Sequence, residues 1–344
     1  MRPTQCRDRY GGYGPGFRSR VSGNETVLLI RERVGAARST LRRHPTAVSL
    51  AGGTIVAIAL AIGLAGHGHE FVVALRSAPF WVLGIAVALH VLWLLARTEA
   101  WNVSIDAAGG SVSRRRTYYA SSLGYLGNIF NGQFGLGVRI TALRRSAPEE
   151  CPRASVLLTA ELPIVVVEIA LAAIFSFTLV APLGVPWWAP LIAFAAVAGL
   201  FAVMQRVARN RRTGIWRGIA VLRETRGSGR IVALVCLAVV LQIARNWLLL
   251  NWSGVDASVF DSTALLIGLA VVGVLPVGPS LGAATAVLIL GTNGVAASAA
   301  AGALLTATAA AGALCFASWA LVDRLWLRAE PTPTPAAALS TPTA

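Results

Sequence analysis

Residues 154–180 read ASVLLTAELPIVVVEIALAAIFSFTLV, and this stretch decides the class of fold. Only two of its 27 side chains are charged, those of Glu161 and Glu168. An α-helix rises 1.5 Å per residue, so a helix of this length reaches about 40 Å and crosses the roughly 30 Å hydrocarbon core of a bilayer. We therefore predict a membrane-spanning helix here.

Five further apolar runs have the length needed to cross a bilayer. Together with the first run they predict an all-α polytopic membrane protein with about six transmembrane helices. The composition agrees, because 13% of the 344 residues are charged, whereas soluble domains have about 25%. The five runs are residues 46–65, 79–96, 187–204, 231–250 and 295–322.

The two ends of the chain are polar. Residues 1–45 contain ten arginines, and we expect a partly disordered cytoplasmic tail. Within it, residues 24–43 form either a basic helix on the membrane surface or part of a solvated tail. Residues 329–344 are rich in Pro, Thr and Ala and predict a second disordered tail. The membrane domain is therefore expected to cover residues 46–328.

Two more segments are apolar but contain residues that interrupt helices. Residues 117–138 include LGNIFNGQFGLG, and residues 262–291 include LPVGPSLG. Asn, Gly and Pro disfavour a continuous helix, and irregular backbone at membrane depth is tolerated only where it is buried in protein or lines a cavity. We expect each segment to form a broken re-entrant helical hairpin, which gives eight membrane elements.

The positions of the arginines favour these hairpins. The net charge is +15, and all 30 basic residues are arginines. Cytoplasmic loops carry an excess of Lys and Arg. With both segments turning back, 28 arginines lie on the cytoplasmic side with both termini; if residues 117–138 cross instead, twelve of these move outside. The hairpin topology leaves Arg76 in an outer loop and orients the two halves oppositely, as in inverted repeats.

Ionisable side chains inside spans cost about 2.5–3.5 kcal/mol each on insertion scales, so they are functional candidates. Glu161 and Glu168 are seven residues apart and share a helix face. Gln242, Arg245 and Asn246 share a face of a later span. We expect the glutamates to contact Arg245. The contact either fixes helix packing or forms a polar path for a headgroup or a proton.

The first broken segment contains a candidate anion site. Arg139 follows Asn128 and Asn131, and a guanidinium beside a broken helix end is suited to bidentate phosphate binding. Glycines there allow backbone N–H groups to approach an anion. The alternative is an interfacial arginine that only extends toward lipid phosphates.

The second broken segment has no charge at its centre. Its candidates are backbone groups at Pro276, Gly278, Pro279 and Gly282, with the hydroxyl of Thr285. These groups either line a path or form a rigid turn that packs the helices.

The sequence contains no motif that indicates an enzyme, a metal site or a cofactor. P-loop, H-E-x-x-H and G-x-S-x-G patterns are absent, and the basic patches lack a folded domain that could present them to nucleic acid. His67 and His69 lie in a short outer loop, and His90, alone in the second span, is expected to be a packing residue. Membrane lipids are the expected partners.

The two broken segments and the helix between them resemble the lysylphosphatidylglycerol synthase transmembrane-region family, a flippase-like family of integral membrane proteins. LGNIFNGQFGLGVRITALRR (126–145) resembles its Asn…Pro-x-x-x-Gly-[DE]-x-x-Arg region. LTAELPIVVVEI (158–169) resembles its Glu-Arg…Asp helix, and LPVGPSLGAATAVLILGTNGV (275–295) its Pro-x-x-Pro-Gly-Gly-x-Gly-x-x-Glu element. The resemblance covers roughly residues 46–328.

Carried over by position, several residues match the family's motifs and are implied to line a lipid path. The chain departs from the family at Asn131, Leu162, Ser280, Leu281 and Thr285, where the family has Pro, Arg, two glycines and Glu. These departures imply another lipid or a member without transport. The matching residues are Asn128, Gly135, Arg139, Glu161, Pro276, Pro279 and Gly282.

The resemblance implies that the chain translocates or binds a phospholipid or a lipid-linked headgroup. Synthase activity is not implied, because no polar stretch exceeds about 45 residues and that activity needs a large soluble domain. One alternative is a membrane scaffold or accessory subunit for an envelope-lipid or glycan enzyme, partnered by that enzyme or by a second copy. Another is an enzyme acting on a lipid-linked donor with the two glutamates as acid and base.

Overall fold

The computed structural model describes residues 62, 67–108, 110, 112–130, 132–146, 151, 153–210, 225–273, 281–291 and 294–329. All of them belong to one unit of the chain, Ser49–Ala344, which is separate from Met1–Val48. Several predictions therefore fall outside the described residues. They concern both polar tails, the first apolar run except residue 62, Asn131, and residues 274–280 with Pro276, Gly278 and Pro279.

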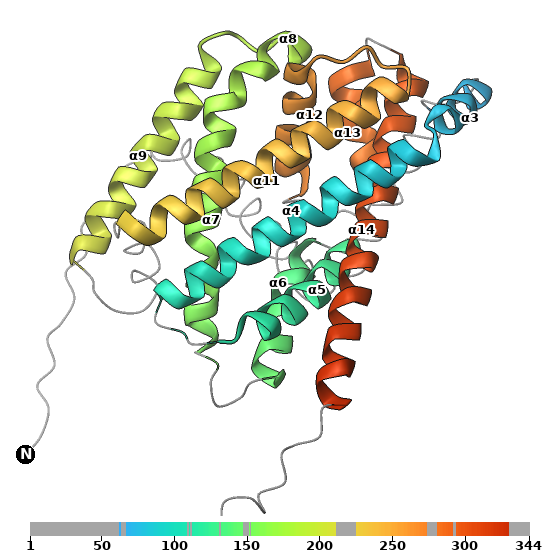
Figure 1. Ribbon diagram of the computed structural model, residues 1–344. Helices are drawn as coiled ribbons and strands as arrows, with labels where there is room; N and C mark the ends of the chain where they lie inside the picture. The colour runs from blue at the N-terminus through green and yellow to red at the C-terminus, as the bar shows by residue number, and fades with distance from the viewer. Residues whose placement is uncertain are drawn as a thin grey trace, which may run out of the picture. The chain divides into compact units, whose positions relative to one another are not determined.

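Every element in the described ranges is a helix, and none is a strand (Figure 1). The all-α prediction is confirmed for these residues. Among the described residues, four helices are long and apolar enough to cross a membrane: α4 (Phe80–Ala107), α7 (Ala154–Phe175) continued by η1 (Ser176–Leu179), α11 (Thr225–Trp252) and α14 (Val295–Ala329). This is the pattern of a helical membrane protein.

The remaining elements are shorter or less apolar. Helix α9 (Ala189–Asn210) has an apolar part, Ala189–Val203, that is shorter than a full span. The other elements are α3 (Gly68–Ser77), α5 (Arg114–Phe130), α6 (Gly132–Ser146), α8 (Val180–Leu183), α12 (Val259–Gly273) and α13 (Leu281–Leu290).

Besides α9, whose run was predicted to span the membrane, two described elements differ from the sequence prediction. Helix α4 continues to Ala107, although the apolar run was predicted to end at residue 96. The extension persists because its charged residues Arg97 and Glu99 find partners inside the protein and because no glycine or proline interrupts it before Gly109. The predicted outer loop also forms a helix, α3, and Arg76 lies in its last turn.

Helices α4 and α11 run side by side, and α14 packs against α4 (Figure 1). Small residues allow these close approaches. A Cβ atom placed on Gly312 of α14 would lie 2.7 Å from the His90 ring of α4, and one on Gly302 would lie 2.5 Å from Ala283 of α13. Small residues at membrane-helix interfaces allow tight packing of this kind.

The first broken segment folds as two antiparallel helices, α5 and α6, that meet at glycines. A Cβ atom on Gly124 would lie 2.8 Å from the Cβ of Arg139, and one on Gly135 would lie 2.6 Å from the carbonyl oxygen of Gly124. Helices α5 and α6 therefore lie antiparallel against each other. The depth of this pair in a bilayer stays a prediction.

The second broken segment also contributes two helices in contact, α12 and α13. Gly268 of α12 faces α13, since a Cβ atom there would lie 3.0 Å from the methyl carbon of Thr285. Helix α13 in turn packs on α14, where a Cβ on Gly282 would lie 2.6 Å from the Thr306 hydroxyl oxygen. Gly282 and Thr285 therefore lie at helix contacts.

Candidate functional site

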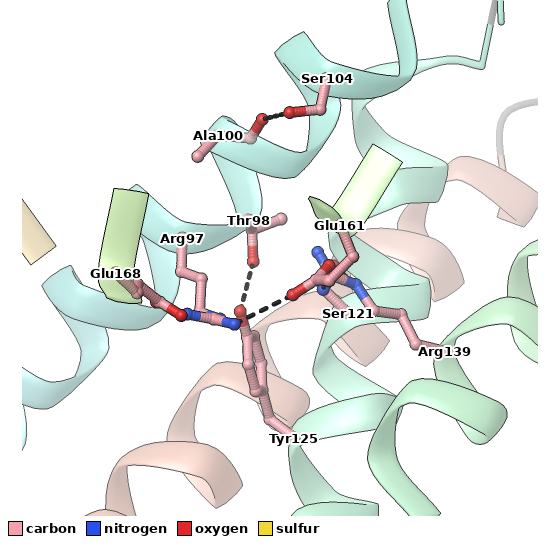
Figure 2. Close-up of polar contacts among 9 residues, drawn as sticks. All are labelled: Arg97, Thr98, Ala100, Ser104, Ser121, Tyr125, Arg139, Glu161 and Glu168. Carbon is pink, nitrogen blue, oxygen red and sulfur yellow. Dashed lines mark hydrogen bonds and ion pairs between the residues drawn. The ribbon is translucent and has the colours of Figure 1, made fainter. Parts of the chain in front are cut away.

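Arg97 of α4 joins the two glutamates of α7 (Figure 2). Its Nη2 lies 2.9 Å from Oε1 of Glu161, and its Nη1 pairs with Oε1 of Glu168. The glutamates lie on one face of α7, two turns apart, as their spacing predicts. The side chains of Arg97 and Glu161 are 18% and 13% exposed, so this contact is largely shielded from solvent.

Arg139 of α6 reaches the same network from the opposite side. Its Nη1 lies 3.2 Å from Oε2 of Glu161, and its Nε donates a hydrogen bond of 3.0 Å to Oγ of Ser121. Its guanidinium carbon lies 3.5 Å from the ring centroid of Trp101, a cation–π distance. Arg139 is 4% exposed. It points into the protein rather than outward toward lipid phosphates.

The packing of α5 on α6 explains why Arg139 points inward. Gly124 of α5 has no side chain where the Cβ of Arg139 approaches. Leu143, one turn farther along α6, is fully buried and packs with Trp101 and Leu157. The face of α6 that contains Arg139 is therefore the packed face, and the arginine must find its partners inside.

The four charges of this network, hereafter the Arg97 network, cancel. It comprises Arg97, Arg139, Glu161 and Glu168 and ties α4, α6 and α7 together. Burying a charge is costly unless it is paired and hydrogen-bonded. One hydrogen-bond donor of the network is unsatisfied: Nη2 of Arg139 is buried and finds no hydrogen-bond partner among the described residues.

A second cluster surrounds Glu99, which is buried two residues after Arg97. Its carboxylate accepts hydrogen bonds from Arg114 at 2.8 Å, from Arg230 at 2.8 Å and from the hydroxyl of Tyr118 at 3.1 Å. The hydrogen bond to Glu99 raises the pKa of Arg114. Both arginine side chains are 60% exposed, so this cluster opens to solvent on one side.

The prediction that the glutamates contact Arg245 is wrong. Arg245 of α11 is 4% exposed, and its Nη1 donates to Gln242 at 3.0 Å and to Nδ1 of His90 at 2.7 Å. Its Nη2 donates to the Thr308 hydroxyl at 3.3 Å and to the Leu305 carbonyl. Within the described part of the chain, all partners of Arg245 are neutral.

The reason lies in the placement of α4, which packs along α11 and also contacts α7. Helix α4 supplies Arg97 to the glutamates and His90 to Arg245, so the glutamates find their counter-charge on α4 rather than on α11. His90 also does more than fill space. A guanidinium only donates hydrogen bonds, so Nδ1 of His90 must be the acceptor.

The other predicted site residues are dispersed. Asn246 is buried but its side-chain amide nitrogen finds no partner in the described ranges, and Asn128 is exposed beside Gly135. Gly282 and Thr285 lie in the contacts of α13 with α14 and α12 described above, away from the Arg97 network. Asn131, Pro276, Gly278 and Pro279 lie outside the described residues.

Sequence reasoning missed Arg97 and Glu99, because they follow the last residue of an apolar run and were assigned to a cytoplasmic loop. A signal was present. Apolar residues continue at helical spacing beyond residue 96, at Ala100, Trp101 and Ile105, all of which are buried. The continued periodicity predicts that the helix carries both charges into the protein.

The described residues contain no group of three His, Cys, Asp or Glu side chains that could hold a metal ion. Comparison with known proteins adds no relative, since no family model, curated protein or solved structure matches the chain. The function must therefore be inferred from the buried charges and from the resemblance of the motifs.

Proposed function

We propose that the chain is an integral membrane protein of the flippase-like family that binds or translocates a phospholipid or lipid-linked headgroup. One observation carries the proposal, the buried guanidinium of Arg139. One carboxylate, one hydroxyl and one indole ring hold it, while its Nη2 remains without a partner in the described residues. An ionisable group at membrane depth is expensive and usually functional.

In the proposed topology, α5–α6 and α12–α13 are re-entrant pairs that enter from opposite sides, and six further helices cross the cell membrane. Both termini are cytoplasmic. The distribution of the arginines supports this arrangement, and the antiparallel packing of α5 on α6 supports a segment that turns back. The two halves of the domain then form an inverted repeat.

The Arg97 network suggests how an anionic headgroup is accommodated. A phosphate oxygen competes with Glu161 for Arg139, since both are anionic acceptors for the same guanidinium. When Arg139 is taken, Glu161 keeps its bond to Arg97 and is not left unpaired. This exchange allows a headgroup to bind without leaving a buried carboxylate unpaired. Before a headgroup binds, the carboxylate of Glu161 takes the place of its phosphate on Arg139.

The test is lipid flipping in vesicles of phosphatidylcholine that contain acyl-labelled phosphatidylglycerol, with dithionite bleaching as the readout. The Arg139→Gln/Glu161→Gln double variant removes both charges of one pair and so leaves no unpaired buried ion. Loss of one charge-assisted hydrogen bond of about 1.5–3 kcal/mol predicts flipping slowed roughly 10- to 100-fold.

The matched control is Arg76→Gln, which changes an exposed arginine in the last turn of α3 and is expected to flip lipid at the wild-type rate. Two results contradict translocation through the Arg97 network. One is a folded wild-type protein that accelerates flipping of no native membrane lipid. The other is a folded double variant that flips lipid as fast as the wild type.

A further inference from the structure

The outer face of α6 has a regular pattern that the Arg97 network does not use. Gly137, Thr141 and Arg145 are four residues apart and form one ridge along the helix. All three are exposed, whereas Arg139 and Leu143 on the opposite face are buried. Helix α6 therefore presents one face to the protein and one to its surroundings.

A groove lies on each side of this ridge. The groove between α5 and α6 has a volume of about 660 Å³, and Leu123, Phe134 and Val138 supply most of its apolar wall. The groove between α6 and α7 has a volume of about 620 Å³ and is bounded by Leu136 and Leu158. Both are predominantly apolar, and both include the ridge residues Gly137, Thr141 and Arg145.

The two ends of the ridge differ. The ridge is lowest at Gly137, which has no side chain. The space above it is open, since a Cβ atom there would meet nothing within 4 Å. Eight residues farther on, about 12 Å along the helix axis, Arg144 and Arg145 occupy the last turn. Arg144 borders the second groove and Arg145 borders both. The two apolar grooves thus share one pair of positive charges at this end, those of Arg144 and Arg145.

We propose that this face of α6 is a binding site for an anionic phospholipid of the bilayer. One acyl chain lies in each groove, on either side of Gly137, and Arg144 and Arg145 hold the phosphate. The charge complementarity argues for this occupant, since guanidinium groups bind phosphate in a bidentate manner. The C-terminus of α6, the negative end of its helix dipole, lies beside the phosphate and disfavours an anion there. Phosphate binding therefore depends on the positive charges of Arg144 and Arg145.

The site rests on the membrane depth proposed above for α5 and α6, but it does not require transport. The site is peripheral, and its arginines belong to the helix surface rather than to the Arg97 network. A protein that flips no lipid can still retain an anionic lipid on this face. Lipid binding and lipid flipping are therefore separate measurements with separate outcomes.

The experiment counts lipids bound to the purified full-length protein in detergent by native mass spectrometry. The probes are phosphatidylglycerol, phosphatidylcholine and glycerol 3-phosphate. Wild-type protein is expected to bind phosphatidylglycerol at least tenfold more tightly than phosphatidylcholine. Glycerol 3-phosphate, which has the phosphate without the chains, is expected not to bind. Equal binding of the two phospholipids, or binding of glycerol 3-phosphate comparable to that of phosphatidylglycerol, overturns the proposal.

Two pairs of variants locate the site. Arg144→Gln/Arg145→Gln is expected to weaken phosphatidylglycerol binding at least tenfold, whereas Arg206→Gln, at an exposed arginine of α9, leaves it unchanged. Gly137→Leu fills the low point of the ridge and is also expected to weaken binding. Its control, Gly199→Leu of α9, is another exposed position where a Cβ meets nothing within 4 Å.

Each variant counts as folded when its thermal unfolding midpoint, measured without lipid, equals that of the wild type. If a folded arginine variant binds phosphatidylglycerol as tightly as the wild type, the proposed phosphate site is refuted. If folded Gly137→Leu does so, the two-groove placement of the chains is refuted, and the arginines act only as a surface charge.

Discussion

At the scale of single residues, the two glutamates of α7 differ in their number of charged partners. Glu161 is shared by Arg97 and Arg139, whereas Glu168 pairs, among the described residues, with Arg97 and is 33% exposed. Removing one partner of a buried ion pair costs about 3–5 kcal/mol because the other charge is left uncompensated. The two glutamates, similar in sequence, therefore have unequal roles.

We expect Glu161→Gln to destabilise the protein by about 3 kcal/mol and Glu168→Gln by less than about 1 kcal/mol, the range for partly exposed pairs. Adding Arg139→Gln to Glu161→Gln should recover part of the loss, since it removes the stranded guanidinium. Denaturant unfolding in detergent measures all three. Equal losses for the two single variants would show that Arg139 does not depend on Glu161.

At the scale of elements, glycine placement decides how closely α5 and α6 approach. Gly135 and Gly137 are two residues apart on α6, yet their surroundings are opposite. A Cβ atom on Gly135 would collide with Asn128 and with the backbone of Gly124, and one on Gly137 would meet open space. The chemical change Gly→Ala is the same at both positions, so the pair separates packing from helix propensity.

Gly135→Ala is expected to destabilise the protein by about 1–3 kcal/mol, the cost of overpacking. Gly137→Ala is expected to be neutral or to stabilise it by up to about 1 kcal/mol, because alanine favours helices over glycine. Thermal unfolding in detergent gives both values. A Gly135→Ala protein as stable as Gly137→Ala would mean that α5 and α6 are not in close contact in solution.

At the scale of the whole molecule, the surface is that of a protein surrounded by lipid. Large apolar side chains are exposed on several helices, for example Val203 on α9 at 60% and Val240 on α11 at 61%. Soluble monomers rarely expose extensive apolar patches. The four long apolar helices of the described residues and this surface agree with one another, and the arginine distribution predicts the direction in which each helix crosses.

That topology predicts the side on which introduced cysteines react with a membrane-impermeant reagent in intact cells. In a background without native cysteines, Arg153→Cys and Arg206→Cys should be protected, and Trp187→Cys and Asp256→Cys should be labelled. All four residues are exposed in the structure. If residues 117–138 cross the membrane instead of turning back, the pattern is inverted at all four positions.

Part of the candidate site was predictable from the sequence. Glu161, Glu168 and Arg245 stand out because each interrupts an apolar run, and the seven-residue spacing correctly puts both glutamates on one face of α7. Arg139 was predicted beside a broken helix end. Arg97 was not predicted as a site residue because it follows an apolar run. At such a position, a helix that continues and a loop that begins have similar local composition.

The sequence by itself determined the helical class and the apolar character of the four long helices in the described residues, and it predicted a break between α5 and α6. These depend on hydrophobic length and on Asn and Gly at one place, which are local properties. Only the tertiary structure decided the partners, with Arg97 and Arg139 on Glu161, and His90 on Arg245. Partner choice depends on which helices lie side by side, and spacing within one helix does not reveal that α4 contacts both α7 and α11.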